Sequence, residues 1–311
     1  MLKNNRSKKS WKTILTVIVL FSLGYYLYKN REVFGELKNL TVEDILIVSG
    51  LHILMIATYS LLSKKMMDKI DPKVSYGDNF LLQYANNFLN KIIPKGGTVF
   101  RGFYLKRVYK FPYSKFLSTV GGLYVITFIS YSLLGLISLL FVYLETGLYN
   151  VVIMAAFLGL LIGTFFIVLL NPNIDRNKNR VFKVLDDILD GWKTIKHYPK
   201  EVIIFVILNF IILFFNTLKI QYLYGSLDLK LNFARSLYLS TVSVITMFIS
   251  VTPDGIGVNE IFYAFSSDIL GIAPERLVFG SLVSRAITTA ISLIVGGVCY
   301  LILIKKARKK M

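Results

Sequence analysis

Residues 237–269 read LYLSTVSVITMFISVTPDGIGVNEIFYAFSSDI, two short apolar runs separated by a break at Thr252-Pro253-Asp254-Gly255-Ile256-Gly257. Neither run has the roughly 20 residues that an α-helix needs to cross a hydrocarbon core about 30 Å thick. Proline and glycine at the break end one helix before the next one begins. The stretch therefore predicts a re-entrant hairpin of two half-helices whose tip lies within the membrane.

A second stretch, near residues 80–98, has the same pattern. The apolar run Phe80–Ile93 is also too short to cross, and it ends in Pro94-Lys95-Gly96-Gly97. Irregular backbone at membrane depth is tolerated only where protein or a wet cavity surrounds it, because lipid cannot satisfy its hydrogen bonds. Two such hairpins of opposite orientation, in corresponding halves, are typical of a transporter-like site near the membrane midplane. Aligning Pro94 and Arg101 with Pro253 and Glu260 favours an inverted repeat.

Longer apolar runs surround the two hairpins. The chain of 311 residues is 55% hydrophobic with a mean hydropathy of +0.60, more apolar than a soluble domain of this size needs. We predict an all-α integral membrane protein with one domain over residues 1–311, its halves at 11–144 and 149–304. The six predicted membrane spans are Trp11–Tyr28, Asp44–Leu62, Phe116–Leu144, Tyr149–Leu170, Val202–Leu223 and Leu277–Ile304.

Two further segments complete the predicted topology. Residues 179–197 repeat apolar side chains at helical spacing, which predicts an amphipathic helix along the cytoplasmic interface. The first span has a basic start and no small-x-small cleavage site after it, so we expect an uncleaved helix rather than a signal peptide.

The formal charge of +18 describes topology rather than nucleic-acid binding. Lys and Arg concentrate in the short segments between apolar runs and at both termini, as the positive-inside rule requires of cytoplasmic segments. We therefore expect a multi-pass protein of the cell membrane with both termini in the cytoplasm. Cys299 is the single cysteine, and His52 and His197 are isolated, so no metal site, cofactor or catalytic set of side chains is expected.

The second hairpin holds the strongest candidate site. Glycines permit close approach of a ligand to the main chain, and a helix beginning near Val258 would offer free N–H groups to a phosphate. The alternative is a tight turn capped by Asp254 or Asn259, with Glu260 favoured by the helix dipole. The candidate residues here are Pro253, Asp254, Gly255, Gly257, Asn259 and Glu260.

Arg285 is an ionisable residue within the last predicted span. Such residues are costly in lipid and usually face a partner or a cavity. Glu260 is its natural partner by depth and side. The pair could contact substrate or gate the site, it could simply fasten the hairpin to the last helix, or Arg285 could snorkel to the outer interface.

The first hairpin contributes a second set of candidates. Arg101 could meet a phosphate from the cytoplasmic side, or it could belong to the basic stretch that follows it. Polar amides in an apolar run could line a cavity or hold helices together. The candidate residues here are Asn87, Asn90, Pro94, Gly96, Gly97 and Arg101.

Taken together, these residues resemble a known family. The early pattern Asn87, Asn90, Pro94, Gly97 and Arg101, followed by residues 252–260 and Arg285, is similar to the lysylphosphatidylglycerol synthase transmembrane-region family, whose members are also called flippase-like or UPF0104 proteins. The family motif is close to Pro-Gly-Gly-x-Gly-x-x-Glu; here Asp254 replaces its first glycine, while Gly255, Gly257 and Glu260 are kept. Many members also carry a Glu-Arg pair where this chain has the uncharged segment 118–123.

The resemblance implies a lipid translocase with a flippase-like fold, acting on an anionic phospholipid or a polyprenyl-phosphate-linked glycolipid. Lysyl-transferring members carry a cytoplasmic transferase domain after the membrane part, and this chain ends at Met311. Two alternatives remain: an integral membrane enzyme of lipid modification, or a subunit that presents lipid to a separately encoded transferase.

Overall fold

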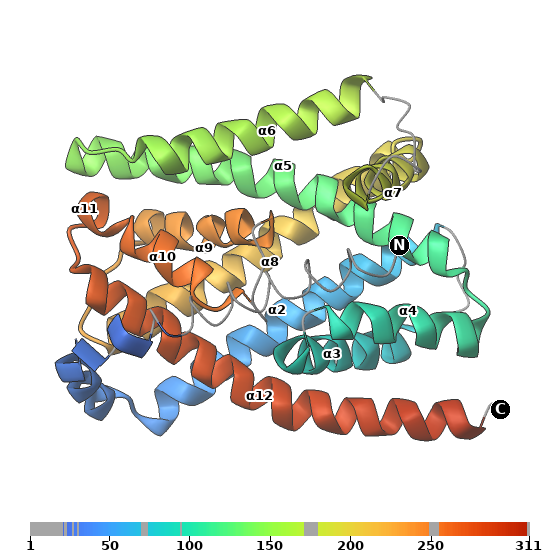
Figure 1. Cartoon of the computed structure of the whole chain (residues 1–311), viewed down its shortest axis with the longest axis horizontal. Helices are drawn as coiled ribbons and strands as arrows, with labels where there is room; N and C mark the ends of the chain where they lie inside the picture. The colour runs from blue at the N-terminus through green and yellow to red at the C-terminus, as the bar shows by residue number, and fades with distance from the viewer. Residues whose placement is uncertain are drawn as a thin grey trace, which may run out of the picture.

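The computed structural model describes residues 21, 24–26, 28–29, 31–69, 74–93, 95–170, 180–248 and 255–309, and all regular elements within them are helices (Figure 1). The predicted all-α fold class is confirmed for these residues. In chain order the elements are the 3₁₀-helix η1 (Arg31–Asn39) and the α-helices α2 (Val42–Asp68), α3 (Tyr76–Ile92), α4 (Gly96–Tyr109), α5 (Tyr113–Thr146), α6 (Val151–Leu170), α7 (Arg180–Ile195), α8 (Pro199–Ser226), α9 (Phe233–Phe248), α10 (Val258–Ala264), α11 (Ser267–Leu270) and α12 (Pro274–Lys309).

Five of the described helices, α2, α5, α6, α8 and α12, are long and apolar enough to cross a membrane. Each of them contains most or all of one predicted span. The remaining predicted span, Trp11–Tyr28, lies mostly outside the described residues. The chain is therefore a membrane protein with several apolar helices.

Polar contacts between helix termini show that these termini gather at two ends of the molecule. At one end, which we call the basic end, Lys69 at the end of α2 pairs with Glu201 at the start of α8, and Lys306 Nζ lies 2.5 Å from Asp78 Oδ1. At the opposite end, Asn39 Nδ2 donates to Asp228 Oδ2 at 2.8 Å. Figure 1 shows the five long helices running between these two ends.

Helices α3 and α4 form a pair that starts and finishes at the basic end. Asp78, in the first turn of α3, contacts Lys306 and also accepts from the hydroxyl of Tyr109, the last residue of α4. Between them the chain reverses at Lys95, whose φ of 61° is left-handed. The break predicted at Pro94–Gly97 thus falls where α4 begins, although Pro94 itself lies outside the described residues.

Helices α9 to α11 form a second hairpin, which starts and finishes at the opposite end. We call α3–α4 and α9–α11 the two returning pairs, and count the short helices α10 and α11 together as the second member of the latter. Arg235, in the first turn of α9, contacts Glu145 at the end of α5 and also donates to the carbonyl of Leu270, the last residue of α11. The second half of this hairpin is two helices rather than the single one predicted over 261–269. The helix stops at Phe265, whose carbonyl accepts from Asn150 Nδ2 at 2.7 Å instead of continuing the helical ladder.

The order of elements repeats along the chain: a long helix, a returning pair and a second long helix occur as α2 to α5 and again as α8 to α12. In Figure 1 the two returning pairs lie at opposite sides of the molecule, between α5 above and α12 below. Each returning pair packs against a long helix from the other half of the chain: α3 packs against α12, and α9 packs against α5.

Two glycines allow especially close helix packing. A Cβ added to Gly97 would lie 1.9 Å from the main-chain oxygen of Asn86, so α3 and α4 touch backbone to backbone. A Cβ on Gly191 of α7 would lie 2.0 Å from the Ser118 oxygen of α5. Helix α7 confirms the helix predicted at 179–197 and rests directly on α5, with Leu189 and Ile195 buried.

Candidate functional site

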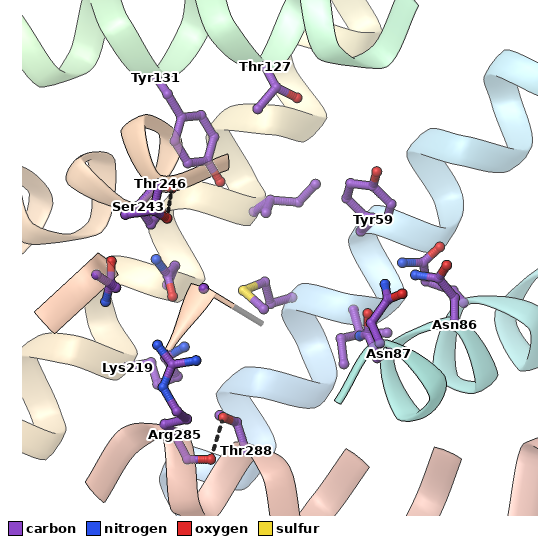
Figure 2. Close-up of a pocket in the computed structure, with 18 of the residues that line it drawn as sticks. Tyr59, Asn86, Asn87, Thr127, Tyr131, Lys219, Ser243, Thr246, Arg285 and Thr288 are labelled. Atoms are coloured by element: carbon purple, nitrogen blue, oxygen red, sulfur yellow. Dashed lines mark hydrogen bonds between the residues drawn. The ribbon is translucent and has the colours of Figure 1, made fainter. Parts of the chain in front are cut away.

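A cavity of about 550 Å³ lies at the centre of the bundle. Its walls come from both returning pairs and from α2, α5, α8 and α12. Figure 2 shows Asn86 and Asn87 on one side of it and Lys219 and Arg285 on the other. The cavity therefore lies where the two repeated units of the chain meet.

The wall is rich in polar side chains although the surrounding helices are apolar. Carboxamides, hydroxyls and basic groups in a membrane segment are costly, and they are usually retained because they serve a polar cavity. The basic lining residues are Arg101, Lys219 and Arg285. The carboxamide lining residues are Gln83, Asn86, Asn87, Asn90, Asn209, Asn216 and Asn259.

Arg101 is the buried cation of the first returning pair and is 4% exposed. Its Nη1 donates to Gln83 Oε1 at 2.8 Å, and its Nη2 donates to Asn79 Oδ1 at 2.7 Å and to Ser63 Oγ. The Phe116 ring lies under the guanidinium, with its centroid 5.6 Å from Cζ. These contacts fix the arginine on α4 against α2, α3 and α5, at the cavity wall.

Arg285 is paired with Glu260, as the sequence predicted. Its Nη2 lies 3.0 Å from Glu260 Oε1, and the Glu260 side chain is 1% exposed. Ser281 Oγ, one turn before Arg285 on α12, donates to the same carboxylate oxygen at 2.9 Å. The pair joins α10 to α12, and the arginine faces the cavity while its partner lies behind it.

The N–H groups in the first turn of α10 stay a predicted phosphate site, but the N–H just before that turn is already occupied. The N–H of Gly257 donates to Glu260 Oε2 at 2.6 Å, so the carboxylate of the chain itself occupies this donor. Gly255 and Gly257 have φ values of 68° and 85°, a left-handed region that favours glycine. Gly255 and Asn259 line the cavity, whereas the predicted site residues Pro253 and Asp254 lie outside the described residues.

The candidates on the first returning pair divide by position. Asn87 and Asn90 line the cavity, and Asn90 Oδ1 also accepts from the N–H of Gly97 at 2.9 Å. Gly96 and Gly97 do not line it, because they pack against α3. Among the sequence candidates, the cavity thus brings together Asn87, Asn90, Arg101, Gly255, Asn259 and Arg285.

Sequence reasoning missed one wall of the cavity, on α8. Asn209, Asn216 and Lys219 all line it, and Lys219 is only 8% exposed. Thr127 donates to Asn209 Oδ1 at 3.2 Å, which ties this wall to α5. Spacings of seven and three residues place these polar side chains on one face of a helix, and that pattern in the span Val202–Leu223 was the available signal.

Within the described ranges, no three His, Cys, Asp or Glu side chains come together as a metal site would require. The chemistry of the cavity wall is instead that of hydrogen bonding and positive charge. Such a wall can bind an oxyanion and a hydroxylated group attached to it.

Comparison with known proteins gives a consistent result. A family model described as "Lysylphosphatidylglycerol synthase TM region" matches residues 11–296. The chain is also similar to the UPF0104 membrane protein MJ1595 of Methanocaldococcus jannaschii, with 22% identity over an alignment covering 100% of this chain and 99% of the relative. No solved structure matches the chain.

Proposed function

The chain belongs to the lysylphosphatidylglycerol synthase transmembrane-region family, and from this premise we propose that it is a lipid translocase. Its substrate is an anionic phospholipid or a polyprenyl-phosphate-linked glycolipid. The headgroup passes through the central cavity while the hydrocarbon chains stay in the bilayer.

One observation carries this proposal: a polar, basic cavity lies where two returning helix pairs from opposite sides of an apolar bundle meet. Hydrophobic packing alone gives no reason to place three cations and seven carboxamides around one space. A headgroup that combines a phosphate with hydroxyl groups would satisfy both kinds of side chain.

The same proposal gives the molecule an orientation. The basic end faces the cytoplasm of the cell membrane, together with both termini, because Lys and Arg concentrate in the segments of that end. The returning pairs act as re-entrant hairpins, α3–α4 from the cytoplasmic side and α9–α11 from the outside. Helix α7 lies along the cytoplasmic interface.

Each candidate residue has a role in this proposal. Arg101, Lys219 and Arg285 attract the anion, while Asn87, Asn90 and Asn259 bind the headgroup. Gly255 and Gly257 shape the second hairpin together with Pro253 and Asp254, and Gly96 and Gly97 shape the first together with Pro94. Glu260 positions Arg285.

The test is lipid translocation in proteoliposomes that contain the full chain. A fluorescent phosphatidylglycerol and a short polyprenyl-phosphate sugar serve as separate probes, and loss of signal to a membrane-impermeant quencher reports movement. We expect one probe to move and Arg285→Ala to slow it strongly. Arg235→Ala is the matched control, since Arg235 pairs with Glu145 at the opposite end and does not line the cavity.

The family description names a synthase, which favours one further candidate function. In this second function the chain is a membrane subunit that presents lipid to a separately encoded transferase. Lipid that co-purifies with the protein, without movement of either probe, would favour presentation over translocation.

A further inference from the structure

The two arginines of the cavity differ in how their charge is balanced. Arg285 shares a buried carboxylate with Ser281 and Gly257, so its positive charge has a negative partner inside the protein. Every acceptor that the described residues offer to Arg101 is a neutral oxygen, from Gln83, Asn79 or Ser63. The first returning pair therefore holds a buried positive charge that the described residues leave uncompensated.

Arg101 also keeps unused donors. A guanidinium has five N–H groups, and three hydrogen bonds are present. Its Nε is buried and has no partner. The side chain nevertheless lines the cavity, so a guanidinium whose hydrogen bonds are incomplete lies at a wall that a ligand can approach.

A buried cation without a counter-charge is unfavourable, because the low dielectric of the interior penalises an isolated charge. A ligand oxyanion removes this penalty and gains charge-assisted hydrogen bonds. At Arg285 the same ligand would have to compete with Glu260. The two arginines are therefore unequal as phosphate sites, although both line one cavity.

We propose that the phosphate group of the lipid binds at Arg101, while Arg285, held by Glu260, joins α10 to α12 and faces the remainder of the headgroup. This inference rests on the proposed function and specifies where in the cavity the anion lies. The phosphate lies beside α3, α4 and α5, and the remainder of the headgroup extends toward the α8 and α10 walls.

Ser63 offers a test that leaves Arg101 itself in place. Its hydroxyl accepts from Nη2 of Arg101 and does not line the cavity. In Ser63→Asp, a carboxylate of the protein pairs with Arg101 and competes with the lipid phosphate. Ser63→Asn is the matched control, because it has almost the same size and shape but no charge.

The measurement is the affinity of purified full-length protein for dioleoyl phosphatidylglycerol, with dioleoylglycerol as the phosphate-free comparison. We expect Ser63→Asp to bind phosphatidylglycerol roughly tenfold or more weakly than Ser63→Asn, since the loss of one hydrogen bond to a charged group changes affinity by about this factor. Arg101→Gln should lose affinity similarly, and Arg101→Lys should recover part of it. A cooperative unfolding transition shows that each variant is folded. If Ser63→Asp does not fold, the affinities of Arg101→Gln and Arg101→Lys test the inference in its place.

The inference would be overturned if Ser63→Asp and Ser63→Asn bound phosphatidylglycerol equally well, or if Arg101→Gln bound it like wild type. Arg101 would then serve only to hold α4 against α2, α3 and α5. A wild-type protein that prefers neither phosphatidylglycerol to dioleoylglycerol nor a polyprenyl phosphate to the corresponding polyprenol would overturn both this inference and the proposed function. Arg101-dependent binding without translocation would contradict the proposed function alone.

Discussion

Glu260 on α10 and Arg285 on α12 form a buried ion pair, with 3.0 Å between Oε1 and Nη2. The same carboxylate accepts the main-chain N–H of Gly257 and the hydroxyl of Ser281. A single side chain thus connects the backbone at the start of α10 to two positions on α12.

Removing one partner of this pair should destabilise the protein strongly. Arg285→Met leaves a carboxylate that is 1% exposed without its counter-charge, and breaking a buried pair in this way costs about 3–5 kcal/mol. The double variant Glu260→Gln/Arg285→Met carries neither charge and should recover much of that loss. Thermal unfolding of the purified variants in one detergent measures both effects, and equal stability of the single and double variants would contradict the pairing.

Gly97→Ala should disturb the first returning pair. The added Cβ would lie 1.9 Å from the Asn86 oxygen, so α4 must move away from α3 at a cost of about 1–3 kcal/mol. Gly77→Ala is the control on the same helix pair, since no atom lies within 4 Å of its added Cβ. The unfolding temperature should fall for Gly97→Ala and stay level or rise for Gly77→Ala. A neutral Gly97→Ala would show that the two helices are not in backbone contact.

Lys219→Gln should slow translocation of an anionic lipid without preventing folding. Lys219 lines the cavity and is 8% exposed, within a helix otherwise suited to lipid. Loss of its charge weakens attraction of a phosphate, and one charge-assisted contact corresponds to roughly tenfold in affinity. Lys230→Gln, at an exposed residue outside the cavity, should behave as wild type in the same proteoliposome assay. Similar transport rates in the two variants would remove Lys219 from the site.

The proposed orientation predicts which positions react from outside the cell. Lys230 follows α8 at the opposite end, and Lys106 lies near the end of α4 at the basic end; both are exposed. A membrane-impermeant maleimide should label Lys230→Cys in intact cells and Lys106→Cys only after permeabilisation. Background is low because the native Cys299 is buried. The reverse labelling would place the basic end outside.

The long helices and the breaks between them could be predicted from the sequence, because the length of an apolar run and the positions of Pro and Gly residues that end helices can be read locally. The Glu260–Arg285 pair could be predicted as well, since an ionisable residue in a span requires a partner at the same depth. Both predictions needed only the residues concerned and their distance from the membrane surface.

Other features depend on contacts between distant segments. The partners of Arg101 include Ser63, 38 residues earlier, and no local pattern identifies that hydroxyl. The end of α10 at Phe265 depends on Asn150, 115 residues away. The hydrogen bond from the N–H of Gly257 to Glu260 was not predicted, because the sequence could not show that this side chain turns back toward the start of its own helix.

The packing of α3 against α12 has a consequence for biogenesis. A ribosome completes α3 and α4 long before it reaches residue 274, so this pair, with the buried Arg101, exists before the helix that packs against α3 has been made. Lys306, which contacts Asp78, is made 228 residues after it. The contacts of α3 with α12 therefore form only after synthesis of α12, so the first returning pair cannot reach its final packing during its own synthesis.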